Sequence, residues 1–511
     1  MKAKYLFIGL FAAALSSCSE DRLFQDPATS FSDETVLESV ESANTVLMGA
    51  YYYTAHYHYH TIGNLCMDVM GDDLKVTDGS YGLSTYNWIM FAYNYTQYPR
   101  VVDGWWSAYA PYMWRQAYHA IDQCNELINY AENLPSSTAS DEAQSKSILA
   151  QAYAIRGYNF LNLFHLFCGS YTGQGASGQG LFLRTTPGSA QSENDVPRSN
   201  LGESFQQIIS DFTNAYNNLS DDRSNSLYIN KDAAALLLAR AYLEMGDYAN
   251  AQKYAETLTN FDGSDLMSQA EWQSGFNTAN KEYLWGFNFT SETTNIYASM
   301  YSFLQFATAK DANSTFGTEG YGSQTDYDYI YDNGLDVLEG YSTIRANNSF
   351  VELFGDGDCR KLFPFYFDEK DGYFIAKFTS KNTSSLGVGD WPMLRLAEAY
   401  LIEAEACLQN GQTAKGLAAL NALQAQRGGT ISTELNIDEV WKERRRELYG
   451  EGFALGDLKR LQKPLERTGI DHWSSTLSLP ANSPRMMFPI PLDELDYNAN
   501  ATSADQNEYW R

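Results

Sequence analysis

Residues 72–105 combine flat aromatic rings with carboxylate, amide and cationic side chains. Aromatic rings can stack on the apolar C–H faces of a ligand, whereas carboxylate, amide and guanidinium groups form directional hydrogen bonds. A sugar has hydroxyls on its rim and C–H patches on its faces, so a site that binds a sugar needs both kinds of side chain. The residues of this kind are Asp72, Asp73, Lys75, Asp78, Tyr81, Tyr86, Trp88, Tyr93, Asn94, Tyr95, Tyr98 and Arg100.

Patterns for catalysis and for metal binding are weaker. The many carboxylates come without a His-x-x-Glu-His or Gly-x-Ser-x-Gly arrangement. His56 and His60 would share a face of a helix, with His58 between them, but no acidic or cysteine ligand stands at a fixed distance from them. Asp356-Gly357-Asp358 is too short for a calcium loop. We therefore expect no catalytic residue, no metal and no cofactor.

The elements that must position such a site are mainly helical. Apolar residues recur at helical spacing over 33–57, 106–133, 141–167 and 204–219, with Ser32 or Asp33 as the first N-cap. Between the first two helices, residues 61–104 lose this period and are dense in Gly, Asp, Asn and Tyr. Long ordered loops in compact proteins are often functional. We predict that this irregular segment carries part of a binding site.

Two segments read as pairs of packed helices. In residues 232–257 small residues stand where two helices would cross, and Gly246 stands at the turn. A second pair covers residues 393–427 and turns at Asn410-Gly411. Both are typical of tetratricopeptide repeats, in which stacked helix pairs build an extended scaffold. The fold class predicted is therefore mainly α: a tetratricopeptide-like helical-repeat scaffold with long irregular insertions and a few short β-strands.

Residues 261–390 lack helical period and form the predicted main insertion. Two pieces with strand-like composition, 283–287 and 373–378, are predicted as short strands. The tail, 453–511, is predicted to be mostly irregular. We expect one domain over 32–511, with the scaffold at about 32–260 and 391–452 and the insertion on the ligand side.

The first 18 residues have the pattern of a secretory signal. Lys2 and Lys4 precede an apolar run that is too short to span a bilayer, and Leu15-Ser16-Ser17-Cys18 resembles a bacterial lipobox. We expect 1–17 to be a signal peptide, Cys18 to carry a lipid, and 18–31 to be a tether. The acidic residues after Cys18 resemble a surface-export signal of Bacteroidetes lipoproteins, which implies an outer-membrane protein that faces the cell exterior.

The net charge and the cysteine pattern limit the kinds of partner and cross-link that this chain can have. The formal net charge is −28, which repels phosphate backbones and excludes nucleic acid as a general partner. The six cysteines show no CxxC pair and no regular spacing, so we expect the five after Cys18 to be small buried residues rather than a disulfide framework.

Several ordered motifs together resemble the SusD/RagB family of outer-membrane nutrient-binding lipoproteins. The match runs nearly from end to end, although Ala454 and Gly456 depart from the pattern. The resemblance implies a SusD-like domain, a SusC-like TonB-dependent transporter as partner, and capture of a glycan or, in one branch, of peptides. The motifs are Trp391 to Ala406, Leu420-Asn421-Ala422-Leu423 with Arg427-Gly428, Glu443-Arg444, Glu447-Leu448, Glu451-Gly452, Asp457 to Arg460, Pro489-Ile490-Pro491 with Glu494, and Gln506-Asn507.

In the family resembled, the loops after the first helix and aromatic residues of the middle insertion carry much of the ligand contact. Packing of the same residues onto the scaffold is the alternative for each of them. A peptide binder of the same architecture, a secreted hydrolase and a tetratricopeptide adaptor remain alternatives for the whole chain. The predicted ligand contacts are Asp73, Tyr81, Trp88, Asn94, Arg100, Trp285, Tyr297, Tyr301 and Tyr321.

The charged residues of the family-like motifs have a structural interpretation. They recur at spacings of three and four, where opposite charges pair across a helical turn. Carboxylates buried at helix crossings are mostly satisfied structural ions. We therefore interpret as fold markers Arg395, Glu398, Glu403, Glu405, Glu443, Arg444, Glu447 and Glu451.

Overall fold

The computed structural model describes most of the chain after residue 36. The residues described are 37, 39–57, 59–76, 109–188, 195–294, 298–305, 307–309, 337–339, 343–363, 372–381, 387–467 and 476–511. Among the helices in these ranges, none combines the length and the apolar character that crossing a bilayer requires.

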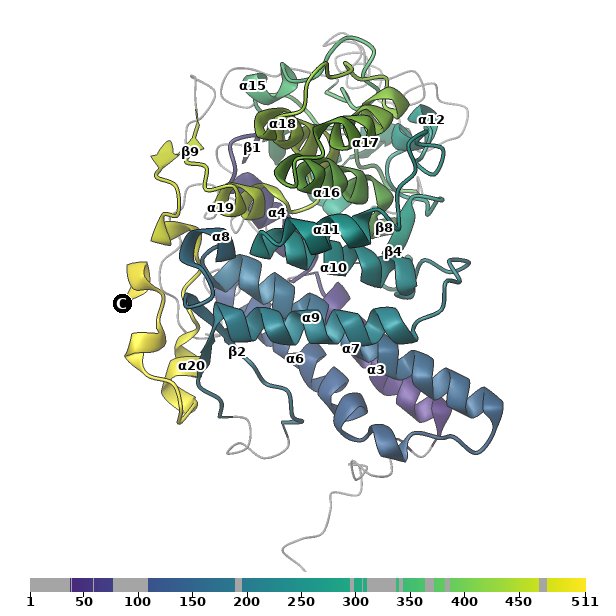
Figure 1. Cartoon of the computed structure of the whole chain (residues 1–511), viewed down its shortest axis with the longest axis vertical. Helices are drawn as coiled ribbons and strands as arrows, with labels where there is room; N and C mark the ends of the chain where they lie inside the picture. Colours follow the sequence, from purple (N-terminus) through teal and green to yellow (C-terminus); the bar gives the residue numbers. More distant parts are fainter. Residues whose placement is uncertain are drawn as a thin grey trace, which may run out of the picture.

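Long helices from the N-terminal part pack side by side in the lower half of the molecule (Figure 1). Polar side chains start three of them: Ser39 closes a capping box at α3, Thr138 caps α7, and Asn200 closes a capping box at α9. The predicted helices are confirmed, although α3 begins at Val40 and its N-cap is neither Ser32 nor Asp33. The bounds are α3 Val40–Ala55, α6 Tyr109–Asn129, α7 Ala139–Phe167 and α9 Leu201–Asn218.

Both predicted helix pairs form, and they lie next to each other. Gly246 and Gly411 stand at the turns with φ of 72° and 73°, in the left-handed region that glycine adopts without strain. Helix α16 packs against α11 and α10, so units far apart in the sequence build one scaffold (Figure 1). The bounds are α10 Lys231–Met245, α11 Tyr248–Ala255, α16 Leu396–Gln409 and α17 Thr413–Gln426, followed by α18 Ile437–Leu448.

The described strands form short antiparallel pairs. The predicted strand at 283–287 is confirmed as part of β4, which pairs with β8 immediately before α16. The prediction at 373–378 is wrong, since only Tyr373 makes an isolated bridge, to Ala346. The pairs are β1 Leu74–Val76 with β7 Ile344–Ala346, β2 Gln179–Phe182 with β3 Arg198–Asn200, β4 Tyr283–Phe289 with β8 Gly389–Arg395, β5 Ala307–Ala309 with β6 Val337–Glu339, and β9 Leu465–Glu466 with β10 Ser478–Leu479.

Shorter helices fill the segments that were predicted to be irregular. Helix α4 is the next helix after α3, and α19 and α20 interrupt the tail, which otherwise runs along one side of the molecule (Figure 1). The bounds are α4 Thr61–Val69, α8 Tyr171–Gln174, α12 Gln269–Trp272, α13 Met300–Leu304, α15 Asn348–Val351, α19 Ala454–Arg460 and α20 Leu492–Tyr497, with 3-10 turns at Ala131–Asn133, Pro484–Met486, Ser503–Asp505 and Glu508–Trp510.

A cluster of ion pairs lies inside the upper half of the molecule, where α16, α17 and α18 meet. We call it the charged core. It confirms the structural interpretation of the charged motifs, but most partners come from distant segments rather than from the next helical turn. Glu398, for example, binds Arg240, and Glu405 binds Arg460. The charged core comprises Glu282, Asp358, Arg360, Lys377, Arg395, Arg427, Glu443, Glu447 and Glu451.

The cysteines in the described part of the chain behave as predicted. Their thiols are free and their side chains are buried, which confirms that they serve as small apolar residues. They are Cys66, Cys124, Cys168, Cys359 and Cys407.

Candidate functional site

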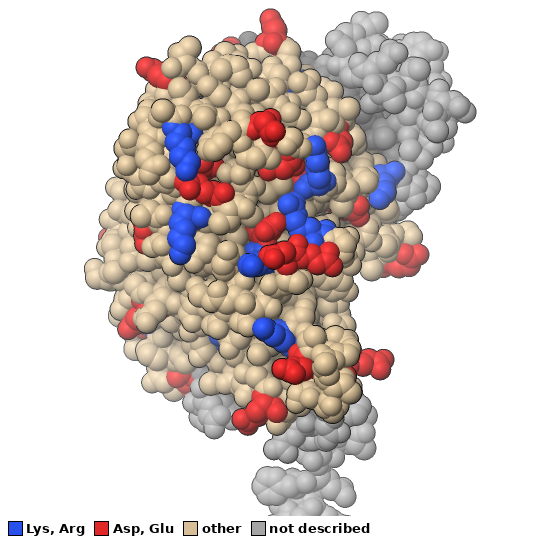
Figure 2. Space-filling view, turned by 45° about the vertical axis from the view of Figure 1, so that its right-hand side comes forward, with Lys and Arg blue, Asp and Glu red and all other residues tan. Residues whose placement is uncertain are grey.

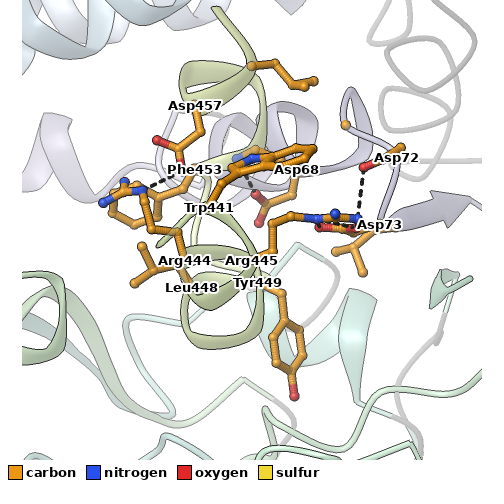
Figure 3. Close-up of a pocket in the computed structure, with 14 residues that line it drawn as sticks. Asp68, Asp72, Asp73, Trp441, Arg444, Arg445, Leu448, Tyr449, Phe453 and Asp457 are labelled. Carbon is orange, nitrogen blue, oxygen red and sulfur yellow. Dashed lines mark hydrogen bonds and ion pairs between the residues drawn. The ribbon is translucent and has the colours of Figure 1, made fainter. Parts of the chain in front are cut away.

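Three of the predicted ligand contacts lie in the described part of the chain. The first is Asp73, which stands at the start of β1 and is 5% exposed. Its carboxylate accepts two hydrogen bonds from Arg445 of α18, from Nε at 3.0 Å and from Nη2 (Figure 3). The contacts that lie outside the described residues are Tyr81, Trp88, Asn94, Arg100, Tyr297 and Tyr321.

The cavity beside Asp73 is small. It has a volume of about 30 Å³, and Trp441, Arg444 and Phe453 stand in its wall (Figure 3). A space of this size holds a water molecule but no sugar ring. Burial and the neighbouring Asp73 raise the pKa of the Asp72 carboxyl to about 6. The geometry therefore gives Asp73 a structural partner, with no room for a ligand beside it.

Trp285 and Tyr301 are buried as well, with exposed fractions of 0% and 1%. The indole of Trp285 is enclosed by aromatic rings, with the Tyr158 centroid 5.1 Å away and the Phe287 centroid 5.3 Å away. Trp285 therefore has no surface to offer a ligand. Tyr301 differs, because it is one of the residues that line a large cavity.

This large cavity, of about 690 Å³, lies between the end of α3, the start of α4, the end of β4 and α13. Pockets that bind small molecules have volumes of about 300–1,000 Å³. Rings form much of the lining, and hydroxyl and amide groups lie among them. The cavity is lined by Met48, Tyr51, Tyr52, Ala55, His56, Tyr57, Thr61, Phe287, Asn288, Phe289, Glu292, Thr293, Thr294, Ala298, Ser299, Met300, Tyr301 and Trp391.

The strand pair β4–β8 supplies one wall. Phe287 lies opposite Trp391 in the ladder, and Phe289 lies opposite Gly389. The ring centroid of Tyr301 is 6.1 Å from that of Trp391. A Cβ atom on Gly389 would come within 2.5 Å of the Tyr301 hydroxyl oxygen, so glycine is what lets this ring close over the strand.

The segment after β4 is held in place by its own hydrogen bonds. The Thr290 amide donates to Thr293 Oγ1 at 2.8 Å, and Thr294 Oγ1 donates to the Gly387 carbonyl at 2.9 Å. On the opposite side, the Tyr51 hydroxyl donates to Gln151 Oε1 at 2.8 Å. A ligand would therefore meet walls that are already ordered, which reduces the entropy cost of binding.

His56 and His60 do not share a helix, because α3 ends before the first and α4 begins after the second. His56 lines the cavity, and burial lowers its pKa. His60 is buried against Phe287 and Trp391, and burial lowers its pKa to about 3. Both imidazoles are therefore neutral at pH 7 and contribute rings to the cavity and its wall.

Two family models match this architecture. The model of the SusD family matches residues 208–510, more than half of the chain. A second model, described as starch-binding and associating with the outer membrane, matches residues 26–243. This chain belongs to the SusD family. The resemblance predicted from the ordered motifs is thereby confirmed.

Named relatives agree with this assignment. A SusD-like protein of Bacteroides ovatus is 24% identical over 489 residues, which cover 88% of this chain and 80% of the relative. The crystal structure of a SusD-like carbohydrate-binding protein from Bacteroides vulgatus superposes with a TM-score of 0.72 at 23% identity, over 92% of this chain and 98% of the other. A laminarin-binding SusD-like protein superposes with a TM-score of 0.68 at 19% identity, over 92% and 99%.

Charge in and around the site of this SusD-family chain is low. Among the described lining residues Glu292 is the charged one, and it is exposed at the rim. On the face shown in Figure 2, the described Lys and Arg side chains lie among Asp and Glu side chains rather than in one continuous block. The described surface thus favours an uncharged ligand over a polyanion.

One group outside the cavity has metal-ligand chemistry. Ligand atoms of Glu256, Glu403 and Cys407 lie within 4.8 Å of one another. The Lys415 ammonium, however, is 2.6 Å from Glu256 Oε1 and supplies positive charge beside the carboxylates. An internal ion pair accounts for this cluster, and we assign no metal to it.

The residues that sequence reasoning missed come from the end of α3. Tyr51, Tyr52 and Tyr57 line the cavity together with His56, yet the predicted site began only at residue 72. The signal was present as the run Tyr-Tyr-Tyr-Thr-Ala-His-Tyr-His-Tyr-His over 51–60. Such a density of rings exceeds what one buried helix face needs.

Proposed function

We propose that this chain is a carbohydrate-binding protein and that the ligand occupies the 690 Å³ cavity. The observation that carries the proposal is the lining of that cavity, in which flat rings stand beside hydroxyl and amide side chains. Rings stack on the C–H faces of a sugar, and the polar groups bond to its hydroxyls. The laminarin-binding SusD-like protein, which shares this fold, supports the same class of ligand.

The proposal also includes a location in the cell and a partner protein. A lipid on Cys18 would hold the domain, 32–511, at the outer membrane by the tether 18–31, on the outer face of the cell. A SusC-like TonB-dependent transporter would receive the glycan. The support is the lipobox-like sequence and the family description, which names association with the outer membrane.

Binding without cleavage is part of the proposal. Hydrolysis of a glycosidic bond requires two positioned carboxyl groups across the bond. Among the described lining residues, Glu292 offers one carboxylate, at the rim. A glycan incubated with the protein should therefore be retained unchanged, and release of shorter products would establish a hydrolase instead.

Affinity electrophoresis on a panel of neutral and acidic polysaccharides tests the binding. Phe289→Ala removes a ring from the cavity wall and should weaken retention of the bound glycan about three- to tenfold. Tyr497→Ala is the matched control, because this ring on α20 is 72% exposed and does not line the cavity. Equal retention by both variants, or binding of a peptide pool and of no glycan, would overturn the proposal.

Two residues predicted from sequence, one as a ligand contact and one as the lipid anchor, give further tests. Trp88, outside the described residues, stays a predicted contact, and Trp88→Ala should weaken retention by about 1–3 kcal/mol. Cys18→Ala should release the protein from the membrane fraction, and a variant that stays bound after a high-salt wash would contradict the lipid anchor. Co-purification of a barrel transporter with the intact protein tests the partner.

A further inference from the structure

Five aromatic rings form a continuous row that begins inside the cavity and ends outside it. We call it the ring row: Tyr57, His56, Tyr52, Tyr53 and His119. Consecutive ring centroids are 4.7 Å apart for Tyr57–His56, 6.3 Å for His56–Tyr52, 5.6 Å for Tyr52–Tyr53 and 4.9 Å for Tyr53–His119. The first and last of these pairs are stacked, with interplanar angles of 26° and 30°.

The ring row crosses from one helix to another. Tyr57, His56 and Tyr52 line the cavity, whereas Tyr53 and His119 are not among its lining residues. Tyr53 is on α3, and His119 is on α6, which packs against α3. The row therefore leads from the cavity over the end of α3 onto the surface of α6.

Exposure separates these rings from the core. Tyr52 is 65% exposed, His119 is exposed, and Tyr53 is half-buried. Core packing does not require a ring with most of its surface in water, and a contiguous exposed group of rings marks an interaction surface. One face of α3 is therefore buried and another is exposed. Ala43, Leu47 and Ala50 pack in the core, and Tyr52 points toward solvent.

The chemistry of the row suits an uncharged polyol. Partial burial lowers the pKa of both His56 and His119, and the positive charge of Arg115 lowers that of His119 further, so both imidazoles are neutral at pH 7. A neutral imidazole offers one donor and one acceptor nitrogen beside its ring face, and each tyrosine adds a hydroxyl. The row repeats the combination of stacking surface and hydrogen-bonding edge that lines the cavity.

We propose that the ring row extends the binding site, so that the ligand is a glycan chain whose further sugar residues leave the cavity across Tyr52 and lie on Tyr53 and His119. This inference rests on the proposed function. It adds that the protein selects long chains over short fragments, because each further ring adds contact that a short fragment cannot reach.

The experiment uses the mature protein and the panel polysaccharide that retards it most. A short and a long fragment of that polysaccharide are prepared by partial acid hydrolysis and size fractionation. Titration calorimetry should give a tighter Kd for the long fragment. His119→Ala should weaken the long fragment about three- to tenfold and leave the short fragment unchanged, whereas Phe289→Ala should weaken both.

Two further variants separate binding from packing. His119→Phe keeps the ring and should retain most of the affinity for the long fragment. Tyr497→Ala removes an exposed ring elsewhere and should change neither Kd. Thermal unfolding midpoints of all variants show whether a loss of affinity merely follows a loss of fold.

The outcomes distinguish the two proposals. Equal Kd values for both fragments, or a long-fragment Kd that His119→Ala does not change, overturn the extended site and leave the cavity site standing. A His119→Ala loss that is the same for both fragments also overturns the extension. Absence of binding to every polysaccharide of the panel overturns the proposed function and the extension together.

Discussion

Nη1 of Arg395 lies 3.0 Å from Oε1 of Glu447, and solvent reaches almost none of either side chain. The same carboxylate accepts hydrogen bonds from Arg427 and Arg360. These arginines come from β8, from the end of α17 and from the segment after α15, so Glu447 joins three segments to α18. Their positive charges hold the pKa of Glu447 well below its usual range, although burial acts in the opposite direction.

Glu447→Gln should destabilise the fold by about 1.5–3 kcal/mol, because it removes the one carboxylate that three buried arginines share, although each arginine keeps another carboxylate partner. The matched control is Glu439→Gln on the same helix, whose partner Lys442 is 2.8 Å away at a partly exposed site. That change should cost at most about 1 kcal/mol. Urea unfolding of both variants measures the difference, and similar losses would show that the charged core contributes no more than a surface pair.

The buried carboxyl of Asp68 should make the stability of the fold depend on pH. Its buried carboxyl accepts hydrogen bonds from the amides of Gly452 and Ala454, at 2.9 and 3.2 Å, and burial raises its pKa from 3.8 to about 7. Between these values the folded protein keeps a proton that the unfolded chain has released. This contribution to stability is therefore present at low pH and is lost as the pH rises toward 7.

Asp68→Asn removes that titration. The difference in the free energy of unfolding, variant minus parent, should rise by up to about 3 kcal/mol between pH 5 and pH 8. The absolute stability of the variant is a separate matter, since the amide keeps one oxygen for two donors. Parallel curves for the two proteins across this range would contradict the assignment.

Substitution of Asp73 tests whether this residue has a structural role or contacts the ligand. Asp73→Asn weakens the paired hydrogen bonds from Arg445, so we expect a loss of about 1–3 kcal/mol in stability and an unchanged Kd for the glycan. Asp72→Asn should cost less, because burial beside Asp73 already disfavours its charge and Arg445 is 3.4 Å away. A weaker Kd at full stability would restore Asp73 as a ligand contact.

The helical scaffold was predictable from sequence because its signals are local. Periodic apolar residues, and glycines at Gly246 and Gly411, act within a few positions of the chain. The charged core was not, since Arg395 finds Glu282 across 113 positions and no spacing rule connects them. Helix α4 was missed because it has only nine residues and no side-chain cap marks its start.

The candidate site shows the same division. Trp285 was predicted as a contact because it is an aromatic residue of the middle insertion, which carries ligand contacts in the family resembled. Its strand faces the core instead, and residue type does not distinguish a ring in a core from a ring in a groove. The rings at the end of α3 could have been predicted from the aromatic run over residues 51–60. Their meeting with Phe289 and Trp391 depends on how β4 and β8 pack beside α3, which is set by tertiary contacts.

Two glycines of the second helix pair test the close crossing on which the scaffold depends. Gly416 is in α17, and a Cβ atom there would come within 2.7 Å of the Ala404 carbonyl and 2.9 Å of Cys407 Cβ, both on α16. Gly411, at the turn, has open space around a Cβ position but a φ of 73°. The first position is restricted by packing and the second by backbone conformation.

Gly416→Ala should therefore force α16 and α17 apart and cost about 1–3 kcal/mol, in spite of the better helix propensity of alanine. Gly411→Ala should cost about 1 kcal/mol, from the left-handed backbone alone. Gly411→Asn provides the diagnostic comparison, because asparagine tolerates this conformation and should recover part of the loss, whereas Gly416→Asn should be worse than alanine. If Gly416→Ala stabilises the protein in urea unfolding, the two helices do not cross as closely as the structure places them.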